Sequence, residues 1–221
     1  MVKAITFDLD NTLYDYDFCH QRAMETLSLY CEEKYVLSAQ EFKQKYDLAK
    51  KIVKNHLGNT GASHNRMLYM QIFLELIGMK PIVGALEMYN IYWNTMLETM
   101  KPFEQVFPLM ETLRKKDIKI AVLTDLTAHI QHRKIIRLGL SEYIDVLVTS
   151  EEAGQEKPDS RMFDLLLEKL ALEPYEVIMV GDSYEKDVLG AKRVGMHGIL
   201  CSAGNRDKLM EKCLEMIENE R

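Results

Sequence analysis

The second half of the chain alternates short apolar runs with segments of helical periodicity, and this alternation is the strongest constraint on its fold. The apolar runs are IKIAVLT (118–124), IDVLVTS (144–150), VIMVG (177–181) and GILCS (198–202), and the helix-like segments lie near 127–138, 159–170 and 185–194. Strands that alternate with helices in this way form parallel sheets with helices on both faces. The pattern predicts an α/β fold with a three-layer, Rossmann-like core around a central parallel sheet, and KAITFDL near the N-terminus is its expected first strand.

Residues 16–100 follow another pattern, with apolar positions at helical spacing and almost no strand signal. Four helices are expected here, within DFCHQRAMETLSLYCEEKY, SAQEFKQKYDLAKKIVKNHL, SHNRMLYMQIFLELIG and ALEMYNIYWNTMLETM. Ser38 and Ser63 are the expected N-caps of the second and third helices, and four helices can close a bundle of their own. We therefore predict a core domain made of residues 1–15 and 101–221, with a four-helix domain of residues 16–100 inserted into it.

Charge and composition narrow the class of protein. The chain carries 28 basic and 34 acidic residues, a net charge of −6, and the basic residues are scattered, so a nucleic-acid partner is not expected. No apolar run reaches membrane-spanning length, and the N-terminal stretch MVKAITFDLD does not resemble a signal peptide. The expectation is a cytoplasmic protein, a monomer or a homodimer, with neither a nucleic-acid nor a membrane partner.

Two acids, Asp8 and Asp10, end the first predicted strand in the stretch AITFDLDNTLYD. Alternate side chains of a regular strand point to the same side, and ligands of open α/β sheets bind beyond the carboxyl ends of the strands. Two like charges need a cation or a shared proton, and Mg²⁺, which prefers oxygen ligands, would satisfy them. The alternative is that Asp10, Asn11 and Thr12 only begin a turn and cap the segment that follows.

Three further polar groups follow later predicted strands. Thr124 could donate to an anionic oxygen, Lys157 could place a positive charge against phosphate, and Asp182 follows an apolar strand, with Asp187 five residues on. Taken singly, Thr124 and Asp182 could be N-caps and Lys157 a surface lysine. Because all of them stand at corresponding ends of strands in one sheet, a single pocket could hold them together with the first two acids, and that set suits phosphoryl transfer.

The ordered set of Asp8-Leu9-Asp10-Asn11-Thr12, Thr124, Lys157-Pro158, and Gly181-Asp182 with Asp187 closely resembles the four motifs of the haloacid dehalogenase superfamily of phosphohydrolases. Each motif alone is weak, whereas the ordered quartet is highly specific. The resemblance covers the α/β core, and the helical insertion after the first motif resembles the subclass with a helical cap. It implies a Mg²⁺-dependent hydrolase that acts on a phosphoric monoester of a small metabolite.

The resemblance also implies roles for the acids. Asp8 would be the nucleophile that becomes an aspartyl phosphate, and Asp10 would protonate the leaving group and then activate water. The metal would be held by the Asp8 carboxylate, the Asp10 backbone carbonyl and Asp182. Asp187 would support a metal-bound water or orient Lys157, which itself would neutralise charge on the phosphoryl group.

The second motif qualifies this resemblance. Thr124 and the N–H of Asp125 would hold phosphoryl oxygens, but Asn or Gly is frequent in the family where this chain has Asp125. A second acid beside phosphate would repel it unless its side chain turns away or pairs with a cation such as Arg133. Family dehalogenases lack an acid at the position of Asp10, so its presence favours phosphate chemistry.

The motifs leave three functions open. The first is a phosphatase, the second is a phosphomutase that resembles the β-phosphoglucomutase branch, and the third is a domain that binds a phosphorylated ligand without turning it over. The first two use the same acids and differ in whether the phosphoryl group passes to water or returns to a sugar. The resemblance implies that side chains of the helical domain select the substrate, so the substrate is not predicted from the motifs.

Overall fold

The computed structural model describes residues 1–202 and 204–219. The chain divides into two compact units, one made of Met1–Asp15 with Lys101–Arg221 and the other made of Tyr16–Met100. They are called the core and the cap below. The core holds a single parallel sheet and the cap is helical, so the predicted α/β fold with a Rossmann-like core and a four-helix unit is confirmed.

The sheet of the core has five parallel strands in the order β3-β2-β1-β4-β5. The strands are β1 (Ala4–Phe7), β2 (Lys119–Thr124), β3 (Val146–Thr149), β4 (Val177–Gly181) and β5 (His197–Leu200). Strand β1 lies in the centre, with Phe7 opposite Val122 on one side and Val180 on the other. The carboxyl ends of β2, β1 and β4 are therefore neighbours at one edge of the sheet.

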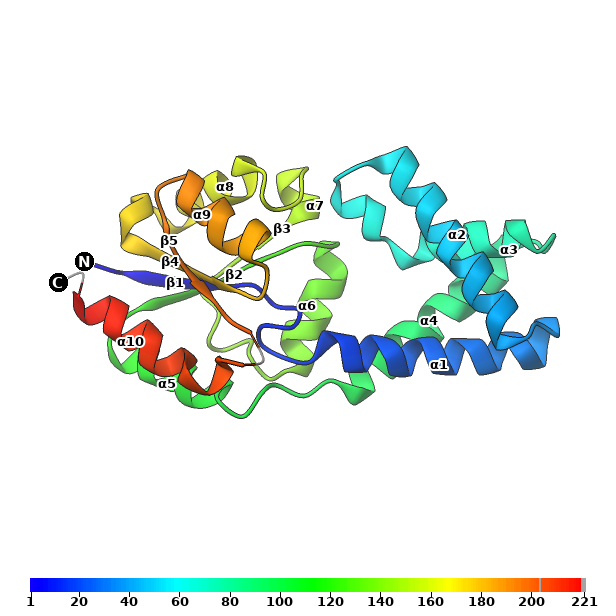
Figure 1. The fold of residues 1–221 in the computed structure, drawn as a ribbon, viewed down its shortest axis with the longest axis horizontal. Coiled ribbons are helices and arrows are strands. Elements are labelled where there is room, and N and C mark those ends of the chain that lie inside the picture. The colour runs from blue at the N-terminus through cyan, green and yellow to red at the C-terminus, as the bar shows by residue number, and fades with distance from the viewer. Residues whose placement is uncertain (203, 220–221) are drawn as a thin grey trace. The chain divides into compact units, whose positions relative to one another are not determined.

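Helices cover both faces of this sheet (Figure 1), with α8 and α9 on one face and α5 and α10 on the other. The helices of the core are α5 (Val106–Lys115), α6 (Ala128–Arg137), α7 (Ser150–Ala153), α8 (Ser160–Leu170), α9 (Gly190–Arg193) and α10 (Leu209–Asn219). A π-helical segment, Tyr184–Leu189, precedes α9, and short 3-10 turns cover Pro174–Glu176 and Arg206–Lys208. This is the doubly covered sheet that the near-continuous apolar runs predict.

Alternate residues of the strands build the interior between the sheet and α8. Ala4 of β1, Leu123 of β2 and Met179 of β4 pack in one buried cluster with Phe163 and Leu166 of α8. Because strand side chains alternate in direction, the residues between them point to the opposite face, and each of the four residues of β1 is fully buried. Every side chain of the central strand is thus packed in the interior. The acids of the first motif come only after the strand has ended.

The cap contains four helices, α1 (Tyr16–Tyr35), α2 (Ala39–Leu57), α3 (Arg66–Leu76) and α4 (Pro81–Thr99), and a 3-10 turn at Gly61–His64. Ser38 caps α2 in a capping box with Glu41, as expected. The expectation for Ser63 is wrong, because Ser63 is buried within the 3-10 turn and Asn65 caps α3 instead, its side chain accepting from the N–H of Met67 at 2.9 Å. Ser63 and His64, which the sequence pattern places at the start of the third helix, belong to this 3-10 turn instead.

Aromatic rings fill the interior of the cap, and one charged side chain lies among them. Arg66 is 7% exposed and donates to the carbonyl of His64 at 2.7 Å and to the hydroxyl of Tyr16 at 2.6 Å. Its guanidinium carbon lies 5.5 to 5.9 Å from the ring centroids of Tyr69, Tyr92 and Trp93. Cation–π contacts and neutral oxygens thus hold this buried cation.

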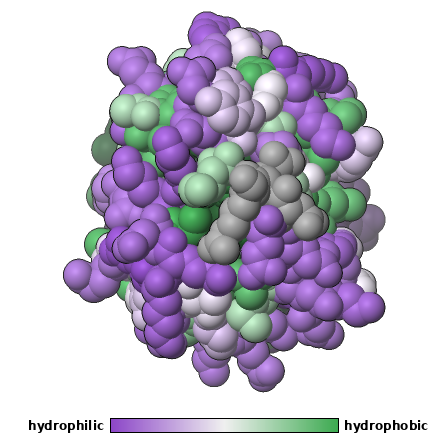
Figure 2. Space-filling model, turned by 90° about the vertical axis from the view of Figure 1, so that its left-hand side faces the viewer, coloured by the Kyte–Doolittle hydropathy of each residue, from purple (hydrophilic) through white to green (hydrophobic). Residues whose placement is uncertain are grey.

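The end of the core at which the strands begin presents a mostly hydrophilic surface (Figure 2), with apolar residues in small groups. In the part of the chain that the structure describes, no helix has both the length and the apolar character that crossing a membrane requires.

Gly190 provides a test of the packing between α8 and α9. A Cβ at this position would lie 2.6 Å from the ring of Phe163, which is fully buried. Replacing glycine by alanine in a helix usually stabilises by about 1 kcal/mol, but we expect Gly190→Ala to lower the free energy of unfolding by roughly 1–3 kcal/mol because the core becomes overpacked.

Urea unfolding of the purified protein measures this change. Gly204→Ala is the matched control, since a Cβ there meets nothing within 4 Å, and it should leave the free energy of unfolding nearly unchanged. A Gly190→Ala protein that is more stable than the wild type would show that the ring of Phe163 does not restrict α9.

Candidate active site

The polar residues of the first, third and fourth motifs meet at the carboxyl edge of the sheet. Asp8 is the first residue after β1, and its N–H donates to the carbonyl of Val180 at 2.8 Å, which holds it beside β4. Its carboxylate is buried, and the structure brings it together with Lys157 and Asp187. Asp182, the first residue after β4, lies next to them.

Lys157 connects three neighbouring strand ends. The side chain is 3% exposed, and its ammonium donates to Asp8 Oδ1 at 2.6 Å, to Asp187 Oδ1 at 2.6 Å and to the carbonyl oxygen of Leu123 at 3.0 Å. An ammonium has three N–H donors, so all of them are used. Gly181 makes this arrangement possible, because a Cβ there would lie 2.2 Å from the Asp187 carboxyl group.

Three carboxylates form a group that could hold a metal ion. One oxygen from each of Asp8, Asp182 and Asp187 lies within 4.8 Å of the others. Burial raises the pKa of Asp8 to about 8; Lys157 opposes this shift, and Asp187 and Asp10 add to it. Burial, followed by the charge of Asp187, also raises the pKa of Asp182.

Both shifts have the same main cause, namely desolvation of the carboxylate, and the negative charge of Asp187 adds to it at Asp8 and at Asp182. Asp182 has no cationic partner within ion-pair distance among residues 1–202 and 204–219. A divalent cation with a preference for oxygen ligands fits this donor set and would supply the missing charge.

Asp10 is not one of those three carboxylates, although its charge acts on both Asp8 and Asp182. Strand β1 ends at Phe7, just before the two acids, and Asn11 has a φ of 59°, so the chain turns directly after Asp10. The Asp10 carboxylate accepts from Lys134 Nζ at 2.7 and 2.8 Å and from the Tyr14 hydroxyl at 2.7 Å. The two acids therefore have different lysines as partners.

Thr124 ends β2 and is fully buried. Its hydroxyl oxygen accepts from Gln131 Nε2 at 2.6 Å, and the same amide nitrogen lies 2.6 Å from the carbonyl oxygen of Asp125. The next residue, Leu126, has a φ of 102°, a conformation that side chains other than glycine rarely adopt, and its N–H donates to Ser150 Oγ at 2.8 Å. Gln131 and Ser150 thus hold the turn of the second motif from two sides.

Asp125 is neutralised by its surroundings. Its carboxylate accepts from the backbone N–H of Lys157 at 3.0 Å and from Lys186 Nζ at 2.8 Å. Burial acts to raise the pKa of Asp125, but the charges of Lys157 and Lys186 outweigh it and hold that pKa below its usual value. Asp125 thus pairs with a cation, as expected, but among the described residues that cation is Lys186, which directly precedes Asp187 of the fourth motif, and not Arg133.

Several polar contacts of the site involve residues outside the predicted set, and two of them had a signal in the sequence. Gln131 and Lys134 are three residues apart on α6 and are both fully buried. They share the buried side of the helix with apolar Ile130 and Ile135, so they are polar residues at core positions, which indicates a buried partner. Lys186 carries no such signal, because its role depends on where the segment after β4 places it.

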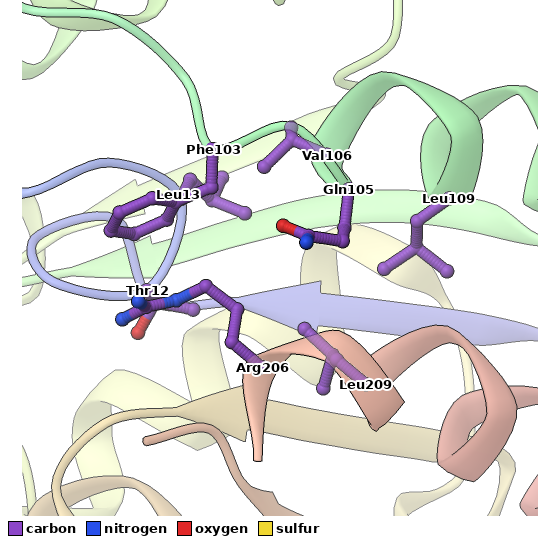
Figure 3. A pocket seen from close by; sticks show the side chains of 8 residues that line it. All are labelled: Thr12, Leu13, Phe103, Gln105, Val106, Leu109, Arg206 and Leu209. Atoms are coloured by element: carbon purple, nitrogen blue, oxygen red, sulfur yellow. The ribbon is translucent and has the colours of Figure 1, made fainter. Parts of the chain in front are cut away.

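A small pocket of the core lies beside the loop after Asp10 (Figure 3), and its walls are mostly apolar. Arg206 borders this pocket, its guanidinium carbon 3.6 Å from the ring centroid of Phe103, and donates to the backbone carbonyl of Asn11 at 3.0 Å. Thr12 and Leu13 line the other side. The pocket contains none of the three acids, and its residues support the loop of the first motif.

The family model of the haloacid dehalogenase-like hydrolases matches residues 2–195. The chain belongs to this family. It is 41% identical over 202 residues to a ribulose-1,5-bisphosphate 5-phosphatase of Halopiger xanaduensis, covering 90% of this chain and 84% of that protein. It is 31% identical over 204 residues to a glyceraldehyde 3-phosphate phosphatase of Methanothermobacter thermautotrophicus, covering 92% and 87%.

Among solved structures, a 2-haloacid dehalogenase from Pseudomonas syringae pv. Tomato has the same fold, with a TM-score of 0.78, 22% identity and full coverage of both chains. The match to the family model and the two relatives confirm the resemblance to the haloacid dehalogenase superfamily.

The pair of Asp125 and Lys186 can be tested with the affinity for inorganic phosphate, the ligand that the second motif would hold. Lys186→Met leaves the Asp125 carboxylate without its side-chain cation, and we expect it to weaken phosphate binding about tenfold, since an uncompensated like charge near a protein surface costs on the order of 1–2 kcal/mol. Isothermal titration calorimetry measures the dissociation constant.

The double variant Lys186→Met/Asp125→Asn provides the control. Removing both charges should restore the affinity to within about twofold of the wild type. If the double variant binds phosphate as weakly as Lys186→Met, the lysine acts by some route other than neutralising Asp125.

Proposed function

We propose that the protein is a Mg²⁺-dependent phosphatase that hydrolyses a small phosphorylated metabolite, a phosphosugar in particular, through an aspartyl phosphate on Asp8. The observation that carries the proposal is the separation of the two acids. Asp8 is buried against Lys157, and Asp10 is half-buried against Lys134 and Tyr14. Two carboxyl groups in different environments can serve as nucleophile and as acid–base group in one reaction.

The relatives support the substrate class. Both proteins named above carry the names of phosphatases, and both names specify a phosphosugar. The chain covers most of the length of each relative, including the region of the cap. A phosphomonoester of a small sugar is therefore the substrate class that we propose for this chain.

The proposed reaction has two steps. In the first, an Asp8 carboxylate oxygen bonds to phosphorus, the bond from phosphorus to the ester oxygen breaks, and that oxygen takes a proton from Asp10. In the second, water attacks phosphorus, Asp10 takes a proton from the water, and the bond between Asp8 and phosphorus breaks to release phosphate. Dividing the displacement in this way replaces one difficult step by two easier ones.

The other residues of the site would bind and orient the phosphoryl group. The Thr124 hydroxyl and the N–H of Asp125 would donate to its oxygens, and Lys157 would offset its negative charge. Asp187 holds Lys157 in place at 2.6 Å.

Asp8, the backbone carbonyl of Asp10 and Asp182 would hold Mg²⁺, with Asp187 in support. The ion, when bound, would supply positive charge against the phosphoryl oxygens.

Asp8→Asn tests the nucleophile. We expect hydrolysis of p-nitrophenyl phosphate to fall by at least about a thousandfold, because an amide cannot form the phosphoenzyme. The matched control is Asp164→Asn on the exposed side of α8, which should retain wild-type turnover. Full activity of Asp8→Asn would exclude Asp8 as the nucleophile.

The same assays separate the alternative functions when the wild-type protein is given ribulose 1,5-bisphosphate, glyceraldehyde 3-phosphate and glucose phosphates. Release of free phosphate indicates a phosphatase, and an isomerised sugar phosphate indicates a mutase. No turnover of any of them, or of p-nitrophenyl phosphate, with Mg²⁺ present would favour a domain that only binds its ligand.

Removal of metal gives a further prediction. EDTA should abolish hydrolysis and added Mg²⁺ should restore it, because the three acids then lack compensating charge. Asp182→Asn should raise the Mg²⁺ concentration required for half-maximal activity by about tenfold or more, since one carboxylate ligand is lost. Activity that persists after exhaustive dialysis against EDTA, with no metal detected by mass spectrometry, would rule out the metal requirement.

A further inference from the structure

Helix α6 places a fully buried lysine against the second acid of the first motif. Lys134 is 0% exposed, and its ammonium lies 2.7 and 2.8 Å from the two oxygens of Asp10. Tyr14, also 0% exposed, donates its hydroxyl to Asp10 Oδ1 at 2.7 Å, and its ring centroid lies 5.8 Å from the ammonium. The Asp10 side chain itself remains 30% exposed.

Stability alone does not account for this arrangement. Removing an ammonium from water is costly, and replacing a buried ion pair by apolar side chains is often neutral or even stabilising. Position 134 faces the interior beside buried Ile130 and Ile135, where leucine or methionine would pack without that cost. The lysine therefore has to be explained by what it does to Asp10.

The contacts restrict Asp10 to one orientation. A carboxylate offers about four lone-pair positions, and the contacts from Lys134 and Tyr14 use three of them. Lys157 does not contribute, because its own three donors are already used by Asp8, Asp187 and the carbonyl of Leu123. One lone-pair position of the Asp10 carboxylate is left. Because this side chain is still partly exposed, that position can contact a substrate oxygen.

A second contact from the same helix supports this interpretation. Gln131, one turn before Lys134, is also fully buried, and its amide nitrogen lies 2.6 Å from the Thr124 hydroxyl oxygen. The two buried polar side chains of α6 thus contact two different motifs of the site. Helix α6 therefore supplies two buried polar side chains to the site, and the contact between Lys134 and Asp10 is not an isolated ion pair.

We propose that Lys134 and Tyr14 are positioning residues that hold the Asp10 carboxyl group for proton transfer and stabilise the charge it acquires. This inference rests on the proposed function. When Asp10 gives its proton to the leaving oxygen, negative charge develops on the carboxylate, and two donors are already in place to receive it. Preorganised donors of this kind stabilise a transition state without further rearrangement. Their effect is confined to substrates whose leaving group needs a proton.

The dependence on the leaving group gives the test. Phenyl phosphate and p-nitrophenyl phosphate share an aromatic ring, but phenolate is a poor leaving group that needs a proton, and p-nitrophenolate departs without one. The value of kcat/KM reports the first phosphoryl transfer, from free enzyme and substrate. For Lys134→Met we expect kcat/KM to fall about a hundredfold with phenyl phosphate and less than about fivefold with p-nitrophenyl phosphate. Tyr14→Phe, which keeps the ring, should show the same selectivity to a smaller degree.

Two controls make the outcome specific. Lys115→Met, the same change at an exposed position of α5, should leave both substrates unaffected. Asp10→Asn should show the selectivity of Lys134→Met, and the double variant Lys134→Met/Asp10→Asn should show no further loss with phenyl phosphate, because both changes remove the same function. Urea unfolding establishes that each variant is folded under the assay conditions.

Each outcome decides between the hypotheses. Equal losses of Lys134→Met and Tyr14→Phe on both substrates, or no loss on either, would overturn the positioning role and leave the phosphatase assignment intact. A wild-type protein that hydrolyses neither aryl phosphate with Mg²⁺ present would instead reject the phosphatase assignment, and the positioning role with it. If Lys134→Met does not fold, the selectivity of Tyr14→Phe decides the question.

Discussion

The arrangement of the site depends on one buried ammonium. Lys157 reaches the carboxyl edge of the sheet from the loop before α8 and donates to a residue after β1, a residue after β4 and a backbone carbonyl of β2. These three strands are neighbours only because β1 lies in the centre of the sheet. Without a cation at that point, Asp8 and Asp187 would be two buried carboxylates facing each other, which a protein tolerates only when one of them is protonated.

The acids of the site differ in how their charge is balanced. Asp8 is paired with Lys157, Asp10 with Lys134, and Asp125 with Lys186. Asp182 is the exception within the described part of the chain, and it is the acid that closes the three-carboxylate group. The pattern separates acids whose position is set by protein contacts from the one acid that is left for a ligand. This distribution supports the proposal of phosphoryl transfer with a bound cation.

Much of the fold was predictable because it follows from local periodicity. The apolar run VIMVG coincides with β4, and the other predicted strands lie within a few residues of the observed ones. Ser38 caps its helix because the capping box with Glu41 is a local interaction. The expectation for Ser63 is wrong for a related reason, since a 3-10 turn and an N-cap use the same residue types, and only the folded chain distinguishes them.

By itself, the sequence determined the fold class, the family and the order of the four motifs. Apolar periodicity and the order of motifs can both be seen along the chain without knowing which residues meet in space. Only the tertiary structure decided which charges meet. It assigned Lys134 to Asp10 and Lys186 to Asp125, across separations of 124 and 61 residues. A helix pattern indicates that position 134 faces inward, but it does not indicate which carboxylate lies opposite. That partner depends on strand order and on the turn after Phe7, because Coulomb and hydrogen-bond energies depend on distance in space and not on distance along the chain.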